Sequence, residues 1–467
     1  MKDNYFKELK ELSSKIWDYS EIKFKEYKSV ESMIKLLKDE GFSVEENLAG
    51  IPTAFSASYG SGKPVIGILG EFDALSGMSQ VENSYEKQSA EVRENGHGCG
   101  HHLLGVAGIG AVLNVRDYVR ENNKEGTIVY YGCPGEEGGS GKAFMVKNGI
   151  FDGVDIALTW HPYNVNAVMS GSMLANIQVV VNFKGISSHA AASPNLGRSA
   201  LDALEIVNIG VNFLREHIKD EERIHYAITD TGGISPNVVQ ASASGLYLIR
   251  AKTTEDVKKL YERFIKIVKG AALITETEYE IIFDKACSHV VPNTVLEKLI
   301  YNSFKKVGIS NYSEEDEKIA SEYRKTFTED DIKGEMLLGL AEDPVELLEY
   351  LNENVLFKRL QEYAHSEKTF MGSTDVGDVS NVVPTAQAMV ACFAIGTPGH
   401  SWQEVSQGKT DYAFKGMKTA ADVMGESAIA AFEDPEIIVD AKEELAKRHN
   451  YKAFESPIPD GAKPHIG

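Results

Sequence analysis

The stretch "NGHGCGHHLLG", residues 95–105, places three histidines and one cysteine within six positions. Thiolate and imidazole groups are ligands for Zn²⁺ and similar transition metals. A zinc finger would need a second ligand pair at short spacing, and none follows. The stretch is therefore either a glycine-rich loop with an incidental histidine cluster, or half of a metal site whose other half lies elsewhere in the chain.

Two adjacent carboxylates, Glu136 and Glu137, lie in the glycine-rich stretch "CPGEEGGSG" after an apolar strand pattern. Neighbouring carboxylates repel each other unless cations or protons neutralise them. Exposed pairs usually form only a solvated turn, but the flanking Pro134 and glycines favour a fixed pair. We expect one carboxylate to bind a metal and the other to act as general base towards the attacking water.

Two more histidines follow apolar strand patterns: His161 in "LTWHPYN" and His400 in "IGTPGHSW". A single histidine at a strand end is more often structural than functional. Together with the cysteine–histidine stretch and the glutamate pair, however, they favour one shared site. We expect His97 and His102 to be structural or to support the ligands.

The elements that must position these residues are those of an α/β domain. Apolar strand patterns alternate with helical patterns through residues 1–173, which predicts a largely parallel sheet flanked by helices. Ligands bind such sheets outside the carboxyl ends of the strands. The tripeptides "EFD", "GEE" and "WHP" follow three of the predicted strands, so we expect them to meet.

A different pattern occupies residues 174–287. The predicted order there is β-α-β-β-α-β, which is typical of a ferredoxin-like α+β unit. The α/β pattern resumes in residues 288–467 and includes an acidic helical segment, residues 312–355, which we expect to be a solvated face or an interface. A polar tail is predicted after the last helical pattern. The sequence therefore predicts a catalytic domain, residues 1–173 and 288–467, with an inserted lid domain.

The overall composition is that of a globular protein, with 467 residues, of which 43% are hydrophobic and 25% are charged. The formal charge of −21 argues against binding to nucleic acid or to anionic membranes. No apolar run has the length of a signal peptide or a membrane span. Four scattered cysteines favour a reduced, cytoplasmic protein.

The motifs together resemble the M20 family of metallopeptidases and amidohydrolases, in its branch with Cys-Gly-His in place of the usual first ligand pair. The resemblance runs over nearly the whole chain, with the motifs in family order. It implies a two-metal catalytic domain with an inserted lid domain that dimerises. The supporting stretches are "AGIPTAFSASYGSGKPVIGILGEFDAL", "GHGCGHHLLG", "YGCPGEEGGSGK", "LTWHP", "HAAASPNLGRSALDALE", "GGISPNVVQ" and "GSTDVGDVSNVVPT".

The resemblance also implies roles for individual residues. Glu136 would be the general base, and His189 of the lid would reach the partner subunit's active site and support the oxyanion. Asn237 and Arg250 would bind substrate, with Arg250 suited to a carboxylate. The metal ligands would be Cys99, His101, Glu137, His161 and His400.

One departure from the family is His102, which stands where the broader branch has an aspartate that orients a ligand histidine. That supporting role is either lost or filled by Asp73 or Glu71. Asp375 is expected either to position substrate or to cap a helix. The roles of His289 and His365 stay open.

The activity implied is metal-dependent hydrolysis of an amide bond in an N-acyl amino acid, with two divalent ions, Mn²⁺ or Zn²⁺, per subunit. The branch implies p-aminobenzoyl-glutamate as substrate, cleaved to p-aminobenzoate and glutamate in folate catabolism. The alternatives are a dipeptidase or aminoacylase of the same family, or a non-catalytic partner subunit. The expected assembly is a homodimer, or a heterodimer with an A-type subunit.

Overall fold

Seven strands form the largest of three sheets in the computed structural model, which describes residues 2–334 and 344–466. Their order is β1-β2-β4-β3-β5-β13-β6. The four central strands, β4, β3, β5 and β13, are mutually parallel, and the outer strands pair antiparallel. The strands are β1 Ser43–Glu46, β2 Phe55–Ser61, β3 Val65–Gly70, β4 Gly126–Gly132, β5 Ile156–Tyr163, β6 Ala167–Met169 and β13 Thr385–Ala391.

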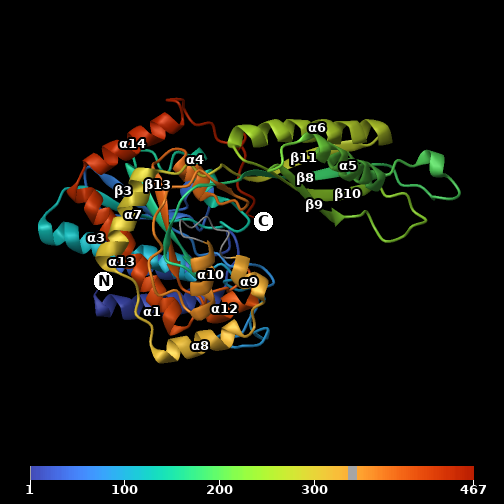
Figure 1. The fold of residues 1–467 in the computed structure, drawn as a ribbon. Helices are drawn as coiled ribbons and strands as arrows, with labels where there is room; N and C mark the ends of the chain where they lie inside the picture. The colour runs from blue at the N-terminus through green and yellow to red at the C-terminus, as the bar shows by residue number, and fades with distance from the viewer. Residues whose placement is uncertain (1, 335–343, 467) are drawn as a thin grey trace.

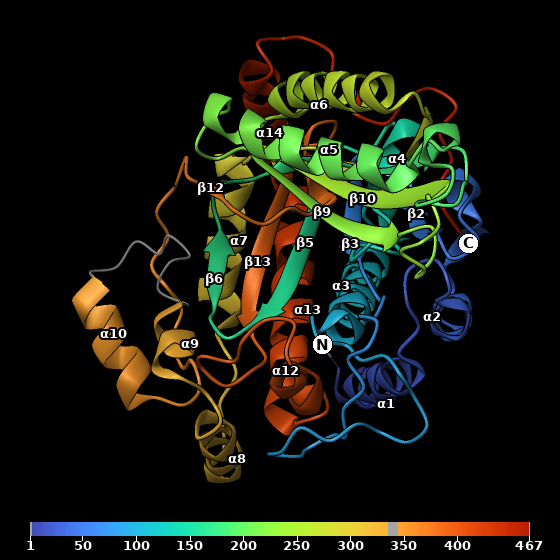
Figure 2. The same cartoon turned by 90° about the vertical axis from the view of Figure 1, so that its right-hand side faces the viewer.

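Helices cover both faces of this sheet, as Figure 2 shows. A continuous apolar core joins the sheet to six of them: α1 Asp3–Tyr19, α2 Tyr27–Asp39, α3 His101–Asn122, α7 Thr294–Val307, α13 Asp411–Glu433 and α14 Glu436–Arg448. On the other face, α4 Gly141–Lys147 and α11 Val376–Ser380 contribute to a second core. This architecture confirms the predicted α/β domain with a mostly parallel sheet.

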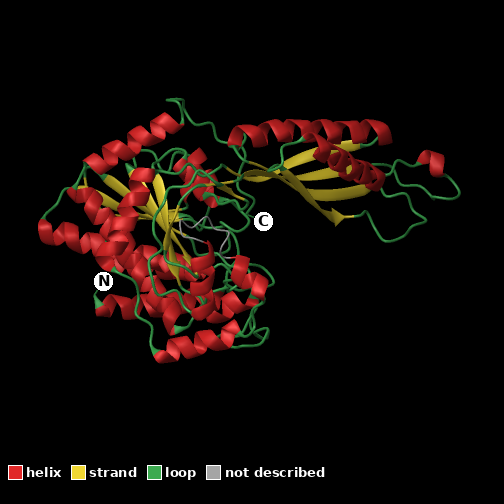
Figure 3. Cartoon of the chain, in the orientation of Figure 1, coloured by secondary structure: helices red, strands yellow, loops and turns green. Residues whose placement is uncertain are grey.

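A second, four-stranded antiparallel sheet is formed by the insertion, in the order β11-β8-β10-β9. The chain order β-α-β-β-α-β confirms the predicted ferredoxin-like unit. This lid projects from one side of the larger domain, with both of its helices on one face of its sheet (Figures 1 and 3). Its elements are β8 Ala175–Lys184, α5 Ala200–Leu214, β9 Arg223–Asp230, β10 Ser242–Ala251, α6 Thr254–Thr275 and β11 Glu278–Cys287.

The acidic segment forms three helices in its described part: α8 Glu314–Arg324, α9 Glu329–Gly334 and α10 Pro344–Glu353. Residues 335–343 of this segment lie outside the described residues. Beyond it, Thr369–Phe370 (β12) pairs in parallel with Ser172–Met173 (β7).

The prediction of a polar tail after the last helical pattern was wrong. Residues Glu436–Arg448 form a further helix, α14, because Ile438 and Ala441 on one face are buried against the sheet domain. Ile458, beyond this helix, is also buried. Among the described helices, none combines the length and apolar character that a membrane crossing requires.

Candidate metal centre

The carboxyl ends of the central parallel strands carry the site. Glu71 follows β3, the pair Glu136 and Glu137 follows β4, and His161 lies near the end of β5. Because β4, β3 and β5 are neighbours in the sheet, their ends deliver these side chains to one edge.

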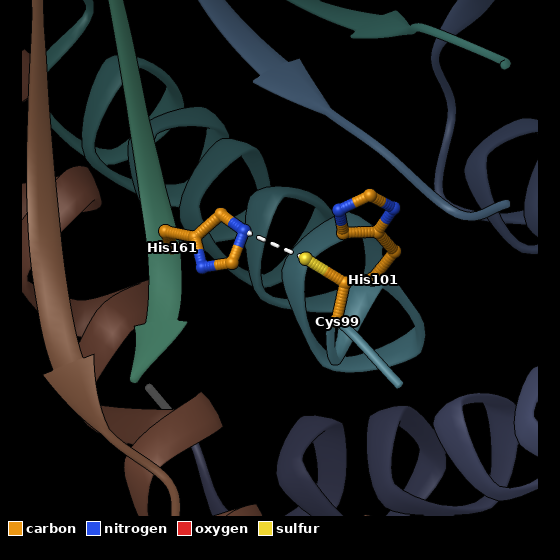
Figure 4. A group of neighbouring side chains, drawn as sticks. All are labelled: Cys99, His101 and His161. Carbon is orange, nitrogen blue, oxygen red and sulfur yellow. Dashed lines mark hydrogen bonds between the residues drawn. The ribbon is translucent and has the colours of Figure 1, made fainter. Parts of the chain in front are cut away.

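Cys99, His101 and His161 form one group of possible metal ligands, with the ligand atoms within 4.8 Å of one another (Figure 4). Cys99 Sγ lies 3.4 Å from His161 Nε2. Gly100, between the candidate ligands Cys99 and His101 at the start of α3, has φ of +71° and lies so close to β5 that a Cβ would come within 2.6 Å of Pro162. Glycine at this position therefore allows the cysteine and the histidine to approach the strand end.

The orientation of His101 is fixed by Asp73. His101 Nδ1 donates to Asp73 Oδ1 at 3.0 Å, which directs Nε2 into the site. Asp73 Oδ2 also accepts the backbone N–H of Glu137 at 3.0 Å, so one carboxylate positions residues from two elements. Asp73 therefore fills the supporting role that His102 cannot. His102 Nε2 instead bonds to the backbone oxygen of Gly408, and His97 Nε2 to that of Ile16.

Two further groups share members with the first. Cys99, Glu137 and His400 form one, with His400 Nε2 3.4 Å from Glu137 Oε1. His400 is held near the histidine stretch because its backbone N–H donates to Gly98 O at 3.0 Å. The other group contains Glu71, His101 and Glu136. Cys99 and His101 each belong to two groups, which is the arrangement that a pair of neighbouring ions would require.

The donor set fits divalent transition metals. His101 Nε2 and Glu137 Oε1 are buried and lack a hydrogen-bond partner in the described protein, and buried polar atoms of this kind require a ligand. Burial, together with the nearby His101, lowers the pKa of His161 to about 4. His161 is therefore neutral at physiological pH and has a free lone pair for a metal.

The two adjacent glutamates differ in their tendency to hold a proton. Burial, together with the charges of Glu71, Asp375 and Glu137, raises the pKa of Glu136 well above its ordinary value. Burial also acts to raise the pKa of Glu137, but His400 and His101 outweigh it and hold that pKa at about 2. Glu137 is thus an anionic ligand, and Glu136 is a carboxyl group that can accept and hold a proton.

Lys142 is a component that the sequence did not reveal. This fully buried ammonium group lies 2.7 Å from Glu71 Oε1 and 2.5 Å from Asp375 Oδ1. Asp375 stands at the N-cap position of α11, but its side chain makes no capping hydrogen bond to that helix. It instead accepts both the backbone N–H and the ammonium of Lys142. No sequence pattern distinguishes Lys142 from a surface lysine of a short helix.

The lid residues occupy two different environments. Arg250 Nη1 lies 3.4 Å from Ser373 Oγ, and Ser373 lines the cavity described below. His189 is exposed, and its Nδ1 accepts the backbone N–H groups of Ala191 and Ala192. Asn237 lies in the adjacent segment, where its backbone oxygen accepts the N–H of Ala190. Neither His189 nor Asn237 lines the cavity of its own chain, which places both outside this site.

The two histidines that the sequence left open have structural partners. His289 Nδ1 lies 2.9 Å from Thr254 Oγ1, where the chain leaves the lid. His365 contacts Glu297 and Glu367 through its two ring nitrogens.

A cavity of about 680 Å³ opens from the ligand cluster. Glu136, Cys99 and His400 line one part of it, and methionine and aromatic side chains line another. Its size falls within the range of small-molecule sites. The cluster is therefore accessible to a compact organic substrate.

Comparison with known proteins identifies relatives of both parts of the chain. Residues 173–276 match the peptidase dimerisation domain family. The whole chain is similar to the B-type subunit of p-aminobenzoyl-glutamate hydrolase from Escherichia coli strain K12, with 45% identity over 97% of this chain and 95% of that protein. It is also similar to the Xaa-Arg dipeptidase of Mus musculus, with 27% identity over 65% of this chain and 69% of that protein.

Solved structures show the same fold at low sequence identity. A Bacillus subtilis dinuclear metal-binding peptidase of the M20 family covers 92% of this chain and 99% of its own, with a TM-score of 0.56 and 15% identity. An aminobenzoyl-glutamate utilization protein from Klebsiella pneumoniae gives a TM-score of 0.60 at 15% identity, covering 92% of this chain and 99% of its own.

Proposed function

Because the chain belongs to the M20 family of metal-dependent peptidases and amidohydrolases, we propose that it hydrolyses the amide bond of p-aminobenzoyl-glutamate and releases p-aminobenzoate and glutamate. The observation that carries this proposal is a half-buried carboxyl group, Glu136, beside unpartnered metal-type ligands in a cavity of small-molecule size. The similarity to the E. coli protein over nearly the full length supports the choice of substrate.

We assign two divalent ions, Mn²⁺ or Zn²⁺, to the cluster. The thiolate favours Zn²⁺, while carboxylate and imidazole ligands accept either ion. Such ions supply a Lewis acid that polarises the amide carbonyl and makes the attacking water more acidic. The assigned ligands are Cys99, His101, Glu137, His161 and His400.

Residues of this chain transfer the proton and bind the substrate. Glu136 accepts the proton of the attacking water on its carboxylate and delivers it to the nitrogen of the leaving glutamate. Burial and the neighbouring carboxylates raise its pKa, so the carboxyl group can hold the proton between the two transfers. Arg250, at the rim of the cavity, binds a carboxylate of the glutamyl group through its guanidinium fork.

His189 and Asn237 act on the cavity of a partner subunit, since neither lines the cavity of its own chain. In that position the His189 imidazole supports the oxyanion of the tetrahedral intermediate. The partner binds through the lid and is a second copy of this chain or a related A-type subunit. We place the protein in the cytoplasm, where the Cys99 thiol stays reduced.

The test uses the purified chain, stripped of metal and resupplied with Mn²⁺ or Zn²⁺ separately. Release of p-aminobenzoate from p-aminobenzoyl-glutamate is followed beside a panel of dipeptides and acyl amino acids. We expect release with at least one of the metals. Turnover of a dipeptide alone would keep the mechanism and change the substrate. No turnover of any amide, even after an A-type subunit is added, would contradict the proposal.

A further inference from the structure

Three methionines and a phenylalanine line one part of the cavity. Met169 on β6, Met389 on β13 and the pair Met173 and Phe370 on β7 and β12 line it. Met173 lies directly opposite Phe370 in the two-stranded sheet. Thioether groups make favourable contacts with aromatic rings and adapt to flat ligands. We call these four residues the methionine wall.

Gln361 is one of several polar residues that line the cavity. It is only 2% exposed, yet neither its Oε1 nor its Nε2 has a hydrogen-bond partner among the described residues. A buried amide without partners is costly, and native proteins rarely retain one unless it serves a ligand or water.

The backbone of Gln361 is fixed, so the orphaned amide is not a consequence of a loose segment. Its N–H donates to Asn166 O at 2.8 Å. The Asn166 side chain in turn holds the preceding residues, because Nδ2 donates to Phe357 O at 3.0 Å and to Arg359 O at 3.3 Å. Asn166 itself is 2% exposed and immediately precedes β6, which carries Met169.

The register of the sheet gives the distance between this amide and the metal ligands. His161 pairs with Met389, and Met389 pairs with Ala167, the first residue of β6. The backbone beside Gln361 is therefore two strand spacings, roughly 10 Å, from that of His161. A benzoyl ring with a para substituent can span this separation once the side chains on either side are included.

The positive charge of Arg250 indicates which end of the substrate lies near the lid. Arg250 approaches the rim at Ser373 and has no carboxylate partner in the described parts of the chain. A glutamyl carboxylate is therefore expected at the lid side. The aromatic acyl group then extends from the metal ligands towards the methionine wall.

We propose that Gln361 determines specificity by recognising an amino group on an aromatic acyl group held against the methionine wall. The ring amine donates a hydrogen bond to Gln361 Oε1, because an aniline nitrogen is a good donor and a poor acceptor. This inference deepens the proposed hydrolysis of p-aminobenzoyl-glutamate and depends on it. A site built to hydrogen-bond a substituent discriminates against analogues that lack it.

The test compares p-aminobenzoyl-glutamate with p-methylbenzoyl-glutamate, in which a methyl group of similar size replaces the amine. For the wild-type chain we expect kcat/KM to favour the amino substrate by about tenfold, the value of one good hydrogen bond. In Gln361→Met the preference should fall to about one, mainly through a lower kcat/KM on the amino substrate. The control variant Gln387→Met, which changes another cavity glutamine that is only half-buried, should retain the preference.

Each result has one consequence. If Gln361→Met keeps the wild-type preference, or Gln387→Met loses it equally, the assignment of Gln361 is overturned while the hydrolase function stands. If the wild-type chain hydrolyses neither substrate, even after an A-type subunit is added, the proposed hydrolysis of p-aminobenzoyl-glutamate fails instead. In that case calorimetric binding of p-aminobenzoate and p-methylbenzoate to the metal-loaded wild-type and Gln361→Met chains still tests the inference, and equal affinities in both chains would overturn it.

Discussion

Glu136 and Glu137 are neighbours in the chain, but the fold gives their carboxyl groups opposite protonation behaviour. Burial among other acidic groups favours the protonated form of Glu136, whereas His400 and His101 favour the anionic form of Glu137. Two carboxyl groups whose pKa values are driven apart commonly divide the roles of acid–base group and electrostatic group. The division predicted from "GEE" alone could not say which glutamate takes which role. The surroundings support Glu136 as the base.

Replacing Glu136 by Gln should therefore lower kcat by about 10²–10⁴-fold, because the amide cannot accept the proton of the attacking water. Metal content, measured by mass spectrometry of the dialysed protein, should stay at the wild-type level. Glu137→Gln is the matched comparison and should lose metal, since it removes an anionic ligand. Loss of metal in the Glu136 variant would instead reassign this residue as a ligand.

Lys142 gives a second prediction about a single residue, which concerns the stability of the fold. Its ammonium is fully buried between Glu71 and Asp375. Removing one partner of a buried ion cluster leaves uncompensated charge and costs about 3–5 kcal/mol. We expect Lys142→Met to lower the free energy of unfolding by this amount in urea titrations.

The double variant Lys142→Met with Asp375→Asn separates charge from packing. It should recover part of the loss, because one uncompensated carboxylate is removed with the lysine. A double variant that is as unstable as the sum of the two single variants would show that Lys142 acts through packing alone.

At the scale of elements, the strand ends were the informative part of the sequence. Apolar runs followed by "EFD", "GEE" and "WHP" predicted parallel strands whose ends meet, and β3, β4 and β5 do meet. The inserted lid domain could also be predicted from the sequence, because six segments of regular length follow the order β-α-β-β-α-β. These segments are long enough for periodicity to specify their type.

The elements and residues that were not predicted have no recognisable pattern in the local sequence. β6, β7 and β12 have two or three residues each, too few for any period, yet they carry three of the four residues of the methionine wall. Gln361 and Lys142 are ordinary polar residues in sequence, and only tertiary burial makes them unusual. The helix α14 was missed because its charged residues outnumber the few apolar ones that pack.

The junction where β11 and α6 meet the larger domain gives a pH prediction. Burial and the nearby His449 lower the pKa of His289 to about 4, although the charge of Asp256 acts to raise it. Thr254 is the first residue of α6. Its backbone N–H and its hydroxyl both donate to His289 Nδ1, so this nitrogen acts as an acceptor. An unfolded histidine has a pKa of about 6.5. As the pH falls from about 6.5 to 4, the unfolded chain gains a proton that the folded chain does not, so stability decreases.

The matched variant is His289→Asn, whose amide oxygen keeps an acceptor near the position of Nδ1 but does not titrate. Between pH 7.5 and pH 5, the wild-type chain should lose about 2 kcal/mol more of its free energy of unfolding than this variant. Urea titrations at the two pH values measure the difference. Equal losses in both chains would mean that His289 does not control acid stability.

At the scale of the whole molecule, the lid extends away from the larger domain (Figure 1), and the two edge strands of its sheet, β11 and β9, each pair with only one strand among the described residues. The edge strand β9 pairs only with β10. On the neighbouring helix α5, Ile209 and Phe213 are 53% and 72% exposed and lie on one face at i and i+4. An exposed edge strand beside an apolar helix face favours pairing with a second lid.

Phe213→Asp should therefore convert the assembly to single chains, as measured by light scattering after size-exclusion chromatography. Activity should fall with it, because His189 would no longer reach another subunit's cavity. Val439→Asp is the control, since Val439 is 57% exposed on α14, away from the lid. It should change neither the assembly nor the activity. A Phe213→Asp chain that stays associated would exclude α5 from the interface.

Mixing two inactive variants tests directly whether sites are shared between chains. A Glu136→Gln chain lacks the base but still offers His189, and a His189→Ala chain retains Glu136 but lacks the lid histidine. In a mixed dimer, the cavity of the His189→Ala chain receives the intact histidine of its partner and should work. Random re-pairing of equal amounts should restore roughly a quarter of the wild-type activity per site, because half of the dimers are mixed and each has one complete site. If the mixture stays as inactive as its components, while light scattering shows that mixed dimers form, then each chain completes its own site. In that case His189 must move to its own cavity by closure of the lid.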